Sequence, residues 1–147
     1  MNTGKPTPEE GYQPKYLGKP GATWEGLDSI PWPYTPGTVV KLTAVDVTTF
    51  CPFTDHPDHY QVVIEYAPDV RVLESKSLKL YLHALRDARE TAETLSRRIL
   101  RVIQSEIRPR RMSVTVTQAS RGGITIEART DGSQERESLT SGMDKGA

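Results

Sequence analysis

The chain has 147 residues, of which 35% are hydrophobic, and 19 Lys and Arg residues balance 19 Asp and Glu residues. This length fits one domain with a modest core, and the zero net charge gives no whole-chain indication of nucleic-acid binding. We find no apolar run long enough to span a membrane and no secretory leader. With a single cysteine, this pattern predicts a cytoplasmic protein.

Polar residues are concentrated at the two ends of the chain. Gly, Pro, Lys and Glu dominate its start, and near its end little beyond Leu139 and Met143 suits a core. We therefore expect a flexible N-terminal tail at 1–29, a folded domain at 30–130 and a flexible C-terminal tail at 131–147. A domain this small with short elements favours stabilisation by self-association.

The first half of the domain predicts two strands. Several prolines in 30–37 exclude a helix there and predict a turn at the end of the segment. Residues 38–50 are rich in Val and Thr and alternate apolar with polar, which is typical of a half-buried strand. A loop follows at 51–58, and residues 59–66 predict the second strand.

The second half predicts two helices and then two further strands. Residues 75–89 and 90–107 repeat apolar residues at helical spacing, which places one apolar stripe on each helix. Residues 112–117 then alternate Met and Val with Ser and Thr, which indicates a strand. A turn at 121–123 separates that strand from the last one, at 124–128.

The order of strand, strand, helix, helix, strand and strand predicts an α+β unit. Each pair of consecutive strands forms an antiparallel hairpin, and the helical pair covers one apolar face of the sheet. The outer edges of such a sheet have unpaired backbone groups, so subunits can join edge to edge.

The single cysteine, Cys51, lies in a proline-stiffened loop. The motif reads Cys51-Pro52-Phe53-Thr54-Asp55-His56-Pro57-Asp58. A lone thiol makes no internal disulfide, so Cys51 is either a buried small hydrophobe or a nucleophile. Asp58, seven positions later, is either a turn residue or an acid near that nucleophile. A second polar block follows and reads Leu73-Glu74-Ser75-Lys76-Ser77-Leu78-Lys79-Leu80-Tyr81.

These two motifs, in this order and at this spacing, resemble the NADPH-dependent 7-cyano-7-deazaguanine reductases of queuosine biosynthesis, the QueF family in its short single-module form. The resemblance runs from about Leu27 to Thr130. It implies the tunnelling fold (T-fold), in which ββααββ units assemble into a ring-shaped barrel with active sites between subunits. It also implies NADPH as the cofactor and a 7-deazaguanine as the small-molecule substrate, reduced from a nitrile to an aminomethyl group.

The resemblance implies a role for each residue of the motifs. Cys51 adds to the nitrile carbon to form a thioimide, and Asp58 donates protons. The substrate-binding residues are Leu73, Glu74, Ser75, Ala92 and Glu93. A carboxylate suits the N–H edge of a guanine-like ring, because it accepts two hydrogen bonds in one plane.

The cofactor-binding residues implied by the resemblance are Lys76, Lys79 and Arg121, whose cations suit the phosphates of NADPH. Arg121 opens an Arg-Gly-Gly turn that the family shares. The alternative for all three is a solvated surface position. The sequence has no G-x-G-x-x-G motif, so a Rossmann dinucleotide site is not expected. No metal is expected either, because Cys51, His56 and His59 have no common zinc spacing.

One position departs from the family pattern. The family has His-Glu where this chain has Ala92-Glu93, so a polar contact to the purine carbonyl is missing. Losing such a contact costs selectivity. Two alternatives therefore stay open. An amidine-forming enzyme of the same scaffold resolves the thioimide with ammonia, and a non-catalytic module binds a deazapurine, or RNA through arginines near residues 97–111.

Overall fold

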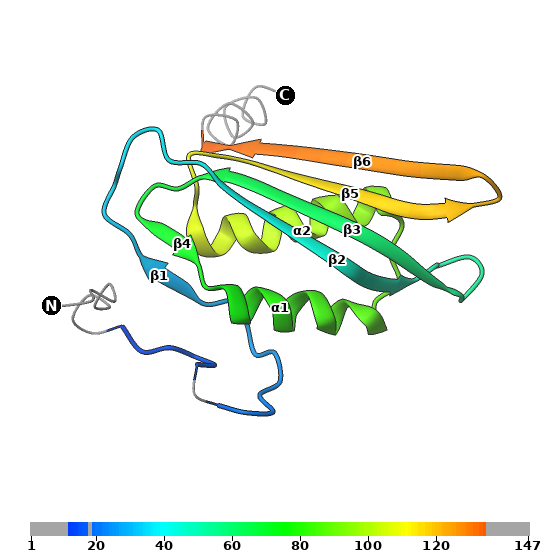
Figure 1. Ribbon diagram of the computed structural model, residues 1–147, viewed down its shortest axis with the longest axis horizontal. Helices are drawn as coiled ribbons and strands as arrows, with labels where there is room; N and C mark the ends of the chain where they lie inside the picture. The colour runs from blue at the N-terminus through cyan, green and yellow to red at the C-terminus, as the bar shows by residue number, and fades with distance from the viewer. Residues whose placement is uncertain (1–11, 18, 135–147) are drawn as a thin grey trace, which may run out of the picture.

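The computed structural model describes residues 12–17 and 19–134. Figure 1 shows one sheet with two helices on one of its faces. The elements, in chain order, are β1 (Ser29–Pro31), β2 (Val40–Phe50), β3 (Pro57–Ala67), β4 (Arg71–Leu73), α1 (Ser75–Ala84), the 3-10 helix η1 (Leu85–Asp87), α2 (Ala92–Ile107), β5 (Arg111–Arg121) and β6 (Ile124–Ser133). The predicted α+β class and the ββααββ order are confirmed.

The main sheet has the strand order β2-β3-β5-β6, and every neighbouring pair is antiparallel. A separate pair, β1 with β4, joins the segment before β2 to the segment before α1. The sequence did not predict this pair, because three-residue strands give too short an alternation to recognise. Within the described residues β2 and β6 are the free edges, where the prediction places subunit contacts.

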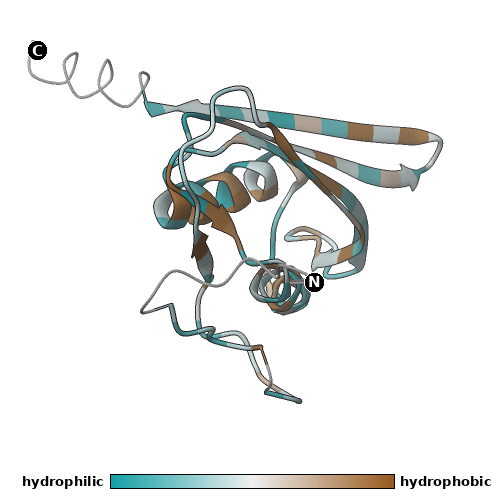
Figure 2. Cartoon of the chain, turned by 60° about the vertical axis from the view of Figure 1, so that its left-hand side comes forward, coloured by the Kyte–Doolittle hydropathy of each residue, from teal (hydrophilic) through white to brown (hydrophobic). Residues whose placement is uncertain are grey.

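The core lies between the sheet and the helices. Inward residues of β3 and β5 alternate with outward ones, and α2 supplies an apolar stripe that includes Leu95, Ile99 and Ile103, each completely buried. In Figure 2 the hydrophobic colour is concentrated on α2 and on the strands above it. No helix in the described part of the chain is long and apolar enough to cross a membrane.

The two helices begin where side chains satisfy their first backbone N–H groups. Glu74 caps α1, and Thr91 forms a capping box with Thr94 at the start of α2. The sequence predicted one helix over 75–89. In the structure α1 ends at Ala84, and the 3-10 helix η1 follows it. The chain is then extended at Ala88, whose carbonyl accepts from Phe50 N–H at 2.9 Å. This tertiary bond ends the helical segment and fixes the end of β2.

Two turns determine where the loop ends of the sheet lie. Gly122 and Gly123 both have positive φ, 57° and 78°, which is the backbone of a tight type I′ hairpin. A register shift between Gln118 and Arg121 adds a bulge just before this turn. Figure 1 shows this turn and the β2–β3 loop at the same end of the molecule, beyond the ends of the helices.

The residues before β1 pack on the domain. Tyr16 and Leu27 are buried, and Lys76 Nζ donates to the Tyr16 carbonyl at 2.7 Å. These packed residues belong to 1–29, the segment for which the sequence predicted a flexible tail. The domain boundary at residue 30 stays a prediction. At the other end, β6 continues to Ser133, and residues 135–147 of the expected C-terminal tail lie outside the described residues.

Candidate active site

The loop after β2 brings the Cys51 thiol to the end of the sheet. Phe50 pairs with Pro57 in the strand register, so the intervening residues form a closed loop. Cys51 N–H donates to the His56 carbonyl at 2.8 Å, and Asp55 N–H donates to the Cys51 carbonyl at 3.0 Å. Asp55, the second acid of this loop, forms an exposed ion pair with Arg89. The backbone of Cys51 is therefore fixed.

The thiol lies in a polar environment that favours the thiolate. The pKa of Cys51 falls from 9.0 to about 7 because the Thr54 hydroxyl donates to sulfur, with further lowering by the N–H groups of Phe53 and Thr54 and by Arg121. Burial, which leaves only 6% of the Cys51 surface exposed, acts in the opposite direction and is outweighed. With a pKa near neutrality, about half of a thiol population is ionised at pH 7.

Asp58 is the buried carboxylate of the same site. It is the second residue of β3, it pairs with Thr49 across the ladder, and only 4% of its surface is exposed. Arg121 Nη1 lies 2.9 Å from Asp58 Oδ1, and Arg121 also contacts the Cys51 thiol. A buried carboxylate beside a cation and a thiol is an arrangement suited to proton transfer.

Gln118 binds the Arg121 guanidinium through nitrogens other than the one that faces Asp58. With its amide oxygen toward Arg121, it accepts from Nε and Nη2, each at 2.7 Å. Gln118 is buried, and the bulge after it turns Arg121 to the same face of the sheet. The arginine is thus fixed between an amide and a carboxylate.

Sequence reasoning missed Gln118, Tyr60 and Thr54. Tyr60 is buried beside this group, where burial raises its pKa and Thr49 donates to its hydroxyl at 3.5 Å. A signal for Gln118 was present, because it continues the inward alternation of Val114 and Val116 as a polar residue on an apolar face. Nothing local indicated Tyr60, since a tyrosine at an inward strand position is an ordinary core residue.

The predicted residues around Glu74 lie at the other end of α1. Both carboxylate oxygens of Glu74 accept backbone N–H groups, from Lys76 and from Ser77, each at 2.8 Å. Leu73 is buried, and its N–H donates to the Tyr66 hydroxyl at 3.0 Å. Since α1 has ten residues, one helix length of about 15 Å separates this group from the Cys51 end.

The remaining substrate-binding candidates open α2, near Cys51. Glu90 N–H donates to the Phe50 carbonyl at 3.1 Å, which holds the segment before α2 against the end of β2. Glu93, in the first turn, is exposed, and it is free to accept hydrogen bonds from a ligand. Ala92, where the family pattern has histidine, is 1% exposed and belongs to the core.

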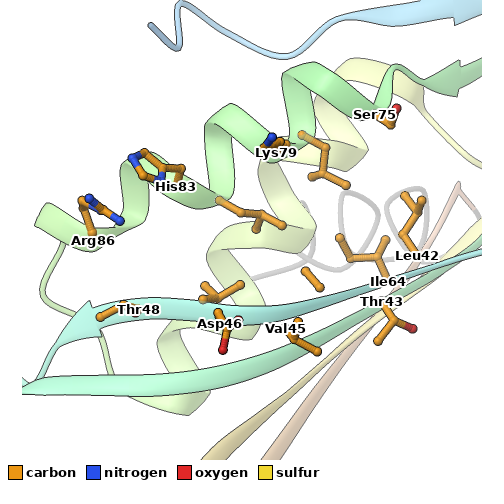
Figure 3. A pocket seen from close by; sticks show the side chains of 14 residues that line it. Leu42, Thr43, Val45, Asp46, Thr48, Ile64, Ser75, Lys79, His83 and Arg86 are labelled. Carbon is orange, nitrogen blue, oxygen red and sulfur yellow. The ribbon is translucent and has the colours of Figure 1, made fainter. Parts of the chain in front are cut away.

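The three predicted cofactor residues have different surroundings. Lys76 Nζ donates to the carbonyls of Tyr16 at 2.7 Å and Lys19 at 3.3 Å, and Arg121 is paired with Asp58. Lys79 instead lines a cavity of about 320 Å³ between α1 and β2, which Figure 3 shows from close by. No group of three His, Cys, Asp or Glu side chains that suits a metal ion occurs among the described residues.

Residues 57–137 match the family model described as "QueF-like protein". The chain belongs to the QueF family. A relative from Rhodopseudomonas palustris, named NADPH-dependent 7-cyano-7-deazaguanine reductase, is 40% identical over 69% of this chain and 65% of its own length. One of the same name from Nitrobacter hamburgensis is 40% identical over 74% of this chain and 70% of its own. This QueF-family chain thus spans less than two thirds of the R. palustris relative.

A solved structure supports the fold assignment. The crystal structure of the archaeosine synthase QueF-Like in the apo form matches with a TM-score of 0.62 and 22% identity, over 67% of this chain and 96% of that one. At this identity the likeness shows the shared T-fold and nothing about the reaction. The predicted membership of the QueF family and the predicted T-fold of the single chain are confirmed. The ring-shaped assembly stays a prediction.

Proposed function

We propose that this QueF-family protein reduces the nitrile of 7-cyano-7-deazaguanine to the aminomethyl group with NADPH, in queuosine biosynthesis. The observation that supports this most directly is the Cys51 thiol, with a pKa of about 7, in contact with Arg121 and beside the buried Asp58. The names of the relatives from R. palustris and N. hamburgensis support the same reaction. The cytoplasmic location belongs to this proposal and is supported by the free cysteine.

The chemistry begins at sulfur. As the Cys51 sulfur adds to the nitrile carbon, a C–S bond forms and one C–N π bond breaks, and the Asp58 carboxylate takes up the thiol proton. Asp58 then donates that proton to the nitrogen to give a thioimide. Two NADPH molecules, bound one after the other, would each supply one of the two hydrides that convert the nitrile carbon to an aminomethyl group. Between the two reductions Cys51 leaves from the tetrahedral carbon as a thiolate, and an imine remains.

The other roles follow from position. Glu93 is exposed near the Cys51 end, so its carboxylate is available to the N–H edge of the deazaguanine. The Leu73–Ser75 segment offers backbone groups, because the Glu74 carboxylate is used as the helix cap. Of the proposed cofactor residues, Lys79 fits an anionic group best, since it is exposed at a cavity.

We also propose that the complete site forms between chains of a ring-shaped homo-oligomer. The groups at Glu74 and at Cys51 lie at opposite ends of α1, too far apart for one small planar molecule to touch both in a single chain. Edge strands β2 and β6 offer backbone groups through which neighbouring chains can pair.

The test is an intact-mass measurement of the protein mixed with 7-cyano-7-deazaguanine in the absence of cofactor. Because Cys51 is the chain's single cysteine, a gain equal to the nitrile that is lost in Cys51→Ala locates the adduct without digestion. Addition of NADPH should then release the aminomethyl product and oxidise the cofactor. An adduct that ammonia but not NADPH resolves indicates an amidine-forming enzyme, and binding without an adduct indicates a non-catalytic module; either result contradicts the proposal.

A further inference from the structure

The exposed side of α2 carries a row of arginines. Arg97, Arg101 and Arg108 follow one another at spacings of four and seven residues, which places them on one side of the helix. We call these three residues the arginine face. The buried residues of α2 lie on its other side, which packs against the sheet in Figure 1. The arginine face is therefore turned away from the core.

The charges of the arginine face are not neutralised by the protein. All three side chains are exposed, and none forms an ion pair or a side-chain hydrogen bond within residues 12–17 and 19–134. The acids close to α2 are engaged or lie apart from the row. Glu90 is paired with Arg98 at 2.6 Å, and Glu106 accepts a hydrogen bond from Ser29 Oγ on the opposite side of the helix. Glu93 stands one turn before the row begins.

Two hollows lie along the arginine face. One, of about 460 Å³, is lined in part by Arg97 and Arg101, and the other, of about 660 Å³, in part by Arg101 and Arg108. Because the two hollows share Arg101, they follow one another along the helix. The row from Arg97 to Arg108 covers about 16 Å of helix axis. A ligand that meets all three guanidinium groups must therefore be elongated and carry several anionic groups.

An exposed aromatic ring lies just beyond the end of the row. Tyr34 is 49% exposed, and the Arg110 guanidinium carbon lies 5.2 Å from its ring centroid. Arg110 also donates to the Tyr34 hydroxyl, and it is two residues beyond Arg108. A tyrosine beside a guanidinium is a platform on which a nucleic-acid base can stack. Unpaired bases are free to stack in this way only in a single strand.

We infer that the arginine face and Tyr34 bind single-stranded RNA, with its phosphates on the three arginines and one base on the tyrosine ring. Guanidinium groups suit this role because each can donate two parallel hydrogen bonds to a phosphate. Gln104 and Ser105, which also line the larger hollow, can bond to the 2′-hydroxyl groups that DNA lacks. The net charge of the chain is zero, so the attraction is local to this face.

A membrane surface fits the arginine face less well than RNA does. A helix that lies in a membrane interface inserts an apolar side between the lipids. The apolar side of α2 is instead buried in the core, where Leu95, Ile99 and Ile103 are completely covered. The inference is independent of the reductase chemistry, because the arginine face and Tyr34 have no part in the proposed active site.

The test is fluorescence anisotropy of a labelled single-stranded RNA of about twelve nucleotides, titrated with the full chain at several salt concentrations. For a single strand the logarithm of the binding constant falls by about 0.7 per neutralised phosphate with the logarithm of salt, so wild type should give a slope of about −2. Arg101→Gln should reduce this slope by about 0.7. Tyr34→Leu should weaken binding about tenfold and leave the slope unchanged.

The matched control is Lys41→Gln, which removes one exposed positive charge from β2 and should change neither slope nor affinity. DNA of the same sequence should bind more weakly than RNA. Nitrile reduction by Arg101→Gln should equal that of wild type, so the failure of this inference and that of the proposed function are distinguishable.

The inference fails if wild type shows no salt-dependent RNA binding, or if Lys41→Gln weakens binding as much as Arg101→Gln. Equal affinity for RNA and DNA contradicts the choice of RNA, and unchanged affinity in Tyr34→Leu contradicts the stacked base. Vesicles of anionic lipid that bind through Arg101 when RNA does not would assign the face to a membrane. If Arg101→Gln changes the sedimentation of the assembly and not RNA binding, the arginine face is a subunit contact and the inference is wrong.

Discussion

Arg121 and Asp58 form an ion pair at 2.9 Å between the end of β5 and the start of β3, two segments more than sixty residues apart in sequence. The carboxylate is buried, whereas half of the arginine side chain is exposed. Arg121 also contacts the Cys51 thiol and is held by Gln118. The arginine that the family pattern assigns to the cofactor therefore organises the proposed catalytic pair in the isolated chain.

Replacing Arg121 should raise the pKa of Cys51 above 7. In Arg121→Leu the thiolate loses a contacting cation, so its ionised fraction at pH 7 falls. The measurement is the pH dependence of Cys51 alkylation by iodoacetamide, whose midpoint reports the thiol pKa. Arg121→Lys keeps the charge and should shift the midpoint less. An unchanged midpoint in Arg121→Leu would show that this contact is absent in solution.

Removing the Thr54 hydroxyl should raise the same midpoint further, because its hydrogen bond is the largest cause of the lowered pKa. Thr54→Val removes the donor and keeps the shape, so the alkylation midpoint should move from about 7 toward the ordinary value of 9.0. Alkylation at pH 7 should slow, since fewer thiols are ionised. Thr54→Ser restores a hydroxyl and is the matched control; if it behaves like Thr54→Val, the hydroxyl is not responsible.

Glu74 should contribute to folding stability through its cap. Glu74→Ala leaves the N–H groups of Lys76 and Ser77 without their acceptors and should lower the free energy of unfolding by about 1–2 kcal/mol. Glu74→Asp, a preferred N-cap residue, should recover most of the loss. Urea denaturation measures the difference. Equal stability of Glu74→Ala and wild type would rule out the capping role. The Glu74 carboxylate would then be available to bind substrate.

Restoring the family's histidine should not improve this chain. Ala92 is 1% exposed, so Ala92→His forces an imidazole into a packed core and should destabilise the fold by about 1–3 kcal/mol. Thermal unfolding and nitrile reduction, measured on the same preparation, test this. The control is Glu93→Gln, an exposed neighbour whose change should leave stability intact and weaken substrate binding. A stable Ala92→His variant with higher activity contradicts the burial argument.

The sequence by itself determined the order of the elements and the identity of the family. Apolar residues with period two and period 3.6 predicted the four main strands and both helices, because these patterns come from local backbone geometry. Two motifs, 51–58 and 73–81, predicted the family by their residues, order and spacing. The strand register places Cys51 and Asp58 at one end of the sheet. Element ends were less well predicted, since tertiary bonds such as Phe50 to Ala88 set them.

Only the tertiary structure decided which partners the candidate residues have. Glu74 caps α1, Lys76 is held by the N-terminal segment, and Ala92 is packed in the core. Arg121 reaches Asp58 because a bulge and a two-glycine turn redirect the end of β5. These relationships join residues that are far apart in sequence, so no local pattern contains them. Periodicity fixes the face on which a side chain lies, whereas register, bulges and packing fix what it meets there.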